Sequence, residues 1–153
     1  MLMWFVIIGL IIGLAIGFAR YRQEHPKKAH TARTIRTLTG SGDFDYEIVG
    51  EASYQDSLFA IAGQNDEAAS HLCEARLWPE PHNPHDRNAI RVEIDDRVVG
   101  YIPRNQTAAF HEILNGRSAI CEAEIVGGWD RGERGRGHFG VKLDIDWPLR
   151  FDD

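Results

Sequence analysis

Residues 80–92, Glu-Pro-His-Asn-Pro-His-Asp-Arg-Asn-Ala-Ile-Arg-Val, constrain the fold of this chain more than any other segment. The prolines fix φ and push the residues before them into extended conformations. The side chains of Asp86 and Asn88 can each bend back onto nearby backbone amides as Asx-turns. The segment then passes into the alternating apolar pattern of a β-strand. We therefore expect a rigid polar turn, here called the ledge (residues 80–88), that presents His85, Asp86 and Arg87.

Residues 1–19 are apolar throughout and carry no charged side chain. As a helix they would extend about 28 Å, close to the hydrocarbon thickness of a bilayer. A cleaved signal peptide would need positive charge before the apolar stretch, and the sequence has none there. The basic residues that follow place the rest of the chain in the cytoplasm. We predict a single-pass inner-membrane protein with a short N-terminus outside and a cytoplasmic C-terminal domain.

The predicted membrane helix has glycines at every fourth position, Gly9, Gly13 and Gly17. Such a stripe lets a second helix approach closely, which would support a homodimer. Glycine is also common in membrane helices for other reasons, and this alternative stays open.

Charge divides the chain into two parts. Residues 20–40 carry six basic side chains and one acidic, whereas the residues after them carry 11 basic and 22 acidic, a net charge of −11. The basic part would attract anionic lipid. The acidic part disfavours tight non-specific binding to a polyanion. Scattered threonines, one proline and Gly40-Ser41-Gly42 predict a flexible linker over residues 20–44.

Residues 45–150 have the pattern of one small, mainly β domain. Alternation predicts strands near residues 46–50, 73–77, 90–94, 97–103, 119–125 and 141–147. Helical spacing predicts short helices over residues 56–64 and 108–114. We expect an OB-like or SH3-like β-barrel of about six strands with two short helices, preceded by one transmembrane helix. Cys73 and Cys121 fall in alternating segments, so we expect small core residues rather than a disulfide framework.

Three segments together resemble the HIRAN domain family: residues 50–55, the ledge with its strand at 80–92, and Val-Gly-Tyr-Ile-Pro-Arg at 99–104. The resemblance covers about residues 46–127. It implies an OB-like barrel with two helices. HIRAN domains occur attached to Swi/Snf-type translocases that remodel stalled replication forks, which implies a link to DNA repair, and as stand-alone bacterial proteins.

Eukaryotic members of this family capture single-stranded DNA ends that carry a free 3′-hydroxyl. Carried over to this chain, the resemblance assigns nucleic-acid binding to Ser53, Tyr54, His85, Asp86 and Arg104, and the charge of Arg87 adds it as a further candidate. The family's aspartate matches Asp86. His85 replaces an aromatic ring, and Ala52 and Ser53 replace an arginine and a tyrosine.

The chemistry of these residues fits an end-binding site. Tyr54 and His85 can stack on bases, and Arg87 and Arg104 can contact phosphates. The ionised carboxylate of Asp86 would accept a hydrogen bond from a 3′-hydroxyl and repel a 3′-phosphate. Each residue also has a structural alternative: Asp86 as a turn cap, Tyr54 as a half-buried barrel residue and Arg104 as a solvated side chain.

We therefore expect a membrane-tethered module that binds single-stranded DNA ends, with a protein- or peptide-interaction module as the alternative. A third hypothesis is a zinc-dependent hydrolase that uses His82, His85 and Asp86. These three supply too few ligands unless His71, His111 or His138 joins them. The sequence has no visible catalytic motif, which favours a binding module without a cofactor. Residues 127–137, rich in glycine and arginine around Trp129, predict either a nucleic-acid contact or a solvated hairpin tip.

Overall fold

A computed structural model describes residues 35–63, 67–130 and 132–152 of this chain. The predicted anchor (residues 1–19) with its glycine stripe, and residues 20–34 of the predicted linker, lie outside the described residues. Among the residues that are described, no helix is long and apolar enough to cross a membrane. Membrane anchoring, dimerisation through the glycines and the cellular location therefore stay predictions.

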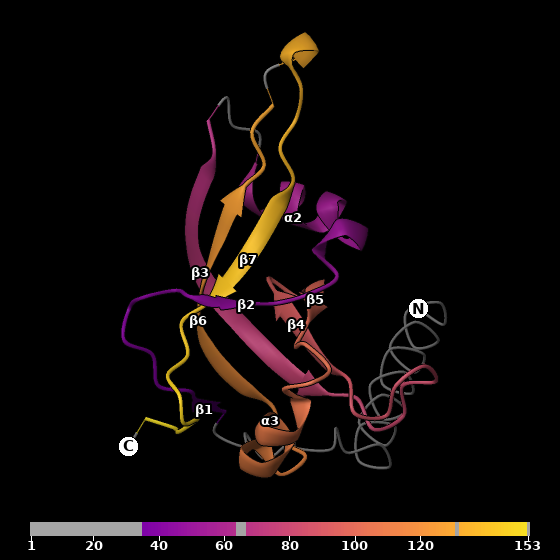
Figure 1. The fold of residues 1–153 in the computed structure, drawn as a ribbon, viewed down its shortest axis with the longest axis vertical. Coiled ribbons are helices and arrows are strands. Elements are labelled where there is room, and N and C mark those ends of the chain that lie inside the picture. The colour runs from indigo at the N-terminus through magenta and orange to yellow at the C-terminus, as the bar shows by residue number, and fades with distance from the viewer. Residues whose placement is uncertain (1–34, 64–66, 131, 153) are drawn as a thin grey trace, which may run out of the picture. The chain divides into compact units, whose positions relative to one another are not determined.

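The described part is a strongly curled β-sheet with two short helices against it (Figure 1). The strands are β1 (Arg36–Thr37), β2 (Tyr46–Glu47), β3 (Ala69–Pro79), β4 (Ile90–Ile94), β5 (Arg97–Tyr101), β6 (Ala119–Gly127) and β7 (Phe139–Leu143). The helices are α2 (Gln55–Ala62) and α3 (Thr107–Leu114), with single 3-10 turns η1 (Glu51–Ser53) and η2 (Gly132–Arg134). The prediction of a mainly β domain with two helices is confirmed.

The strand order is β2-β7-β6-β3-β4-β5, and β1 lies beside β6. All neighbours are antiparallel except β1 and β6, which are parallel. The two ends of this order meet at one bridge, where the backbones of Val49 and Tyr101 exchange hydrogen bonds of 2.9 and 2.8 Å. The sheet therefore curls far enough for the segment after β2 to touch β5.

The β4–β5 hairpin forms where the sequence predicts it. Ile90, Val92 and Ile94 alternate with polar residues, and all three are buried. Asp95 and Asp96 connect the strands with φ values of 49° and 58°. Two positive φ values match the twist of a two-residue hairpin, and aspartate tolerates them better than most residues.

Both helices end at residues that can adopt positive φ. α3 stops at Asn115 (φ 47°), where its predicted range ends. α2 stops at Gly63 (φ 78°) and therefore ends two residues before the predicted end at residue 64, because the positive φ of the glycine terminates it. α2 buries Leu58, and α3 buries Phe110 and Leu114. Each helix thus covers part of the core with one apolar face.

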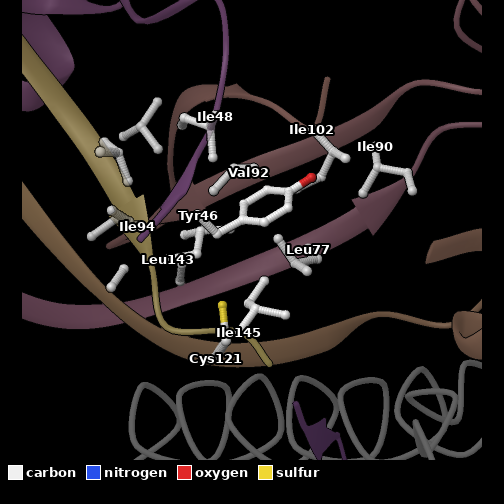
Figure 2. Packing of buried hydrophobic residues seen from close by; sticks show 14 of the residues in the cluster. Tyr46, Ile48, Leu77, Ile90, Val92, Ile94, Ile102, Cys121, Leu143 and Ile145 are labelled. Carbon is white, nitrogen blue, oxygen red and sulfur yellow. The ribbon is translucent and has the colours of Figure 1, made fainter. Parts of the chain in front are cut away.

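The core lies inside the curl and is built from the inward-facing residues of the strands. Figure 2 shows the Tyr46 ring in the middle of it, surrounded by aliphatic side chains from several strands. These include Ile48, Leu77, Ile90, Val92, Ile94, Ile102, Leu143 and Ile145. Burial raises the pKa of Tyr46 far above its usual range. Cys121 is buried and Cys73 half-buried, and both are free thiols.

The end of the predicted linker makes specific contacts with the domain. β1 pairs with β6, and the N–H of Leu38 donates to the carbonyl of Ile120 at 2.8 Å. The buried Asp144 carboxylate accepts the Gly42 N–H at 2.8 Å. Gly40 approaches so closely that an added Cβ would lie 2.1 Å from Asp144 Oδ2. The boundary at residue 44 stays a prediction, but these residues are held by hydrogen bonds.

Candidate functional site

The ledge follows β3 and is held by hydrogen bonds within its own sequence. Asn83 Oδ1 accepts the backbone N–H groups of His85 (2.9 Å) and Asp86 (3.2 Å), and Asp86 Oδ1 accepts the N–H of Asn88 (2.9 Å). Asn83 Nδ2 donates to Glu80 Oε2 at 2.8 Å. The predicted Asx-turn at Asp86 is confirmed. Asn83, rather than Asn88, provides the second one.

Asp86 and Arg104 form an ion pair across 18 positions of sequence. Arg104 Nε donates to Asp86 Oδ2 at 2.9 Å. The Asp86 side chain is 23% exposed, whereas that of Arg104 is 80% exposed. The buried Thr107 hydroxyl donates to the Arg104 carbonyl at 3.0 Å, which fixes the backbone of Arg104 at the start of α3. The carboxylate is therefore positioned from both sides while most of the guanidinium faces solvent.

Two tyrosines from different elements lie against each other beside the ledge. Tyr54 precedes α2 and Tyr101 ends β5, and their ring centroids are 6.3 Å apart at an angle of 48°. Burial, then a hydrogen bond to Tyr54 and the charge of Glu80, raises the pKa of Tyr101 to about 12. Both rings are half-buried. This pair offers an aromatic surface.

Arg91 connects the tyrosines to the ledge. It lies opposite Tyr101 in the β4–β5 pair. Its guanidinium binds Glu80 at 2.7 Å and Glu93 at 2.9 Å. Since Glu80 also holds Asn83, one set of contacts runs from Arg91 into the turn that carries Asp86. With two carboxylates on it, Arg91 is occupied in supporting the site rather than available to a phosphate.

The structure brings three of the six predicted residues together at the ledge and places a fourth, Tyr54, against Tyr101. Tyr54 lies beside Tyr101, and Asp86, His85 and Arg104 meet at the ledge. Ser53 ends η1, and Arg87 is exposed on the ledge; both are close in sequence to these residues. Sequence reasoning missed Tyr101 and Arg91. Only the pairing of β4 with β5 reveals them, because it places Arg91 opposite Tyr101 on the outer face of the sheet.

The described residues contain no set of side chains placed to bind zinc. In residues 35–63, 67–130 and 132–152 no three histidine, cysteine or acidic side chains gather as metal ligands would. The Asp86 oxygens accept hydrogen bonds from Asn88 and Arg104 instead. His111, a proposed further ligand, contacts the carbonyl of Asn88 through Nε2 at 3.0 Å.

A hollow in the surface begins one residue after Tyr54, at Gln55. It has a volume of about 440 Å³ and lies between α2 and the β6–β7 connection. Its apolar walls are Phe59, Trp129 and Phe139. Gln55 holds the two sides together, because its amide donates to the Phe139 carbonyl at 3.0 Å and accepts the Phe139 N–H at 2.9 Å. Trp129 thus lines a groove. Whether this groove contacts nucleic acid, one of the two interpretations of residues 127–137, stays a prediction.

Comparison with known protein families matches residues 41–133 to the HIRAN domain. The chain belongs to the HIRAN family. HIRAN domains are in general nucleic-acid-binding modules. The match includes the ledge, Arg91, both tyrosines and Arg104, whereas Phe139 of the hollow lies outside it. No curated protein and no solved structure matches this chain.

Proposed function

We propose that this HIRAN domain binds the end of single-stranded DNA and that Asp86 recognises a free 3′-hydroxyl. The observation that carries the proposal is the fixed position of the Asp86 carboxylate against the exposed guanidinium of Arg104. The ledge that holds it is linked through Glu80 and Arg91 to the strand that carries Tyr101, the partner of Tyr54. An end-binding site needs these three chemical groups within a short distance.

Each group has a separate role. The carboxylate accepts the terminal hydroxyl and disfavours a terminal phosphate by charge repulsion. Tyr54 and Tyr101 provide ring faces for the last bases, each worth about 1–3 kcal/mol in single-strand binding. Arg104 keeps Nε on Asp86 and directs its remaining N–H groups toward the phosphate before the end.

The electrostatics favour end recognition over binding along a strand. Arg87 and Arg104 are the exposed cations of the site, and the residues after position 40 carry a net charge of −11. Two phosphate contacts to a single strand give a salt slope of about −1.4. A steeper slope would require cations beyond those of this surface.

The experiment is fluorescence anisotropy with the full chain in mild detergent and short oligonucleotides that end in a 3′-hydroxyl or a 3′-phosphate. We expect the hydroxyl end to bind at least about tenfold more tightly, since the phosphate loses a charge-assisted hydrogen bond and adds repulsion. Asp86→Asn should remove this preference, and Asp96→Asn, the same change in the exposed hairpin turn, should not. Equal affinity for both ends in the unmodified protein would refute the proposal.

We further propose that residues 1–19 anchor the domain in the inner membrane, with dimerisation through Gly9, Gly13 and Gly17. The support is the apolar length and the basic residues that follow it. Membrane fractionation followed by carbonate extraction tests the anchor. Recovery of the full chain in the soluble fraction would refute it.

A further inference from the structure

The first half of β3 forms an open edge of the sheet. β3 pairs with β6 along Ala69–Leu77 but with β4 only along Arg76–Pro79. In the part of the chain that the structure describes, no strand pairs with the other side of β3 before Arg76. Figure 1 shows this half of β3 as the margin of the sheet, beyond the end of the β4–β5 hairpin.

The backbone groups that face this margin follow from the alternation of antiparallel pairing. The Glu80 N–H donates to the Ala89 carbonyl at 2.9 Å, so the even-numbered residues of β3 direct their N–H and C=O groups toward β4. Beyond β4 the same alternation directs the backbone groups of Ser70, Leu72 and Glu74 outward. These form a template for one further strand.

The side chains at this edge are exposed and include an apolar one. Ser70, Leu72 and Glu74 point to the outer face of the sheet, and Leu72 is 66% exposed, more than any other large hydrophobic residue in the described part. A hollow of about 380 Å³ lies next to Leu72, with Phe44 and Ile120 among its walls. Residues 69–75 contain no proline, and no strand among residues 35–63, 67–130 and 132–152 pairs with this side of β3 before Arg76.

The side chains around the edge are mainly acidic, and one of them, Glu124, has Lys142 opposite it on β7. Glu74 lies directly opposite Glu122, and Leu72 lies opposite Glu124. None of these glutamates forms a salt bridge with another described residue. Like charges directly opposite each other destabilise a strand pair. The exposed Asp95 and Asp96 add charge at the end of β4, where an added strand would begin.

From these observations we infer that the β3 edge, defined as residues 69–75, binds an extended basic peptide as an additional strand. The peptide places an apolar side chain beside Leu72 and a Lys or Arg two positions to either side. One cation then faces Glu74, and the other lies next to Ser70 and Glu124. The pattern basic-x-apolar-x-basic reads the same in both directions, so either strand orientation satisfies it.

A second copy of this chain fits the edge less well. Antiparallel pairing about Leu72 would place Glu74 beside Ser70 of the other copy, whose hydroxyl donates to Glu124 at 2.5 Å. Glu74 of each copy would then approach Glu124 of the other. Charge complementarity therefore selects the basic peptide over self-association. This surface is independent of the DNA end proposed for the ledge.

The test uses the full chain in mild detergent and a capped peptide, Gly-Lys-Thr-Val-Thr-Lys-Gly. We expect saturable binding, with slower amide hydrogen exchange at Ser70, Leu72 and Glu74. Glu74→Lys should weaken binding about tenfold, because it replaces an attractive cross-strand pair with a repulsive one. Glu112→Lys, the same change on α3, should bind like the unmodified protein, and a peptide with Glu for both Lys should not bind.

Three results would overturn this inference. The first is the absence of binding at millimolar peptide. The second is binding that leaves the three amides exchanging at their free rates. The third is protection of the same amides that grows with protein concentration without peptide, which would identify a second copy as the occupant.

Discussion

β3 is one continuous strand whose two halves have opposite surroundings. Its second half, Arg76–Pro79, is paired on both sides along part of its length and leads into the ledge, where each carboxylate has a partner. Glu80 binds Arg91 and Asn83, Glu93 binds Arg91, and Asp86 binds Arg104. Its first half is paired on one side, and its glutamate faces another glutamate.

This difference separates two kinds of binding surface. A site with satisfied carboxylates is preorganised: its charges are positioned before the ligand arrives, and little ordering is required on binding. An edge where two glutamates lie opposite each other and the backbone groups are free gains its partners only when a further strand is added. The ledge is suited to a small, defined chemical group, and the β3 edge to a flexible segment.

The largest change in stability is expected when Arg91, the cation between Glu80 and Glu93, is removed. Arg91→Met should lower the free energy of unfolding by about 2 kcal/mol, because two partly buried carboxylates lose their partner. Urea denaturation measures the change. Arg97→Met, an exposed arginine on the neighbouring strand, is the matched control and should change stability by less than about 0.5 kcal/mol. Similar losses in both variants would mean that Arg91 does not organise the ledge.

Tyr46 carries one of the unsatisfied polar groups of the buried core. Its hydroxyl is buried and has no hydrogen-bond partner among the described residues. Tyr46→Phe should therefore raise the free energy of unfolding by about 1 kcal/mol, since an unsatisfied buried hydroxyl is removed without loss of ring packing. Thermal and urea unfolding measure it. Destabilisation instead would show that the hydroxyl is hydrogen-bonded in solution.

On the β3 edge, removal of a charge should stabilise the protein. Glu122→Gln relieves the repulsion with Glu74 and should add about 0.5 kcal/mol to the free energy of unfolding. The gain should shrink in high salt, because both groups are exposed and screened. Glu112→Gln on α3 is the control and should leave stability unchanged. A loss of stability in Glu122→Gln would mean that this glutamate already has a cationic partner.

The smallest change is expected in the alkaline titration of Tyr101, which reports on its contact with Tyr54. Its pKa is raised from 10.0 to about 12, so the folded state favours the neutral hydroxyl. The resulting contribution to stability is complete below pH 10 and is lost as pH rises from 10 to 12. Tyrosinate absorbance near 295 nm should show a late step that Tyr101→Phe removes. A single step near pH 10 in the unmodified protein would place Tyr101 in solvent, away from Tyr54.

Local patterns in the sequence predict much of this fold. The hairpin at Asp95-Asp96, α2, α3 and the Asx-turn at Asp86 all depend on residues within a few positions of each other, where φ preferences and periodicity act directly. β1 was not predicted because two residues have no periodicity, and its strand exists through pairing with β6. β3 extends beyond the predicted strand near residues 73–77 because β6 supplies partners as far as Ala69.

The site was predictable only in part for the same reason. The family resemblance identifies Asp86, Tyr54 and Arg104 by residue type. It does not reveal that Arg91 supports the ledge or that Tyr101 completes the aromatic pair, because both roles arise from the pairing of β4 with β5 and from contacts across the curl. Long-range contacts depend on tertiary structure and leave no local pattern.

The central claim is that Asp86 reads the terminal hydroxyl, and a double-mutant cycle tests it most directly. Affinity is measured for oligonucleotides that end in a 3′-hydroxyl or in 3′-hydrogen, with the unmodified chain and with Asp86→Asn. We predict that loss of the hydroxyl costs the unmodified chain about 1.5–3 kcal/mol, the range for a hydrogen bond to a charged group, and costs Asp86→Asn clearly less. Equal costs in both proteins would contradict the account, because the hydroxyl would then be bound elsewhere.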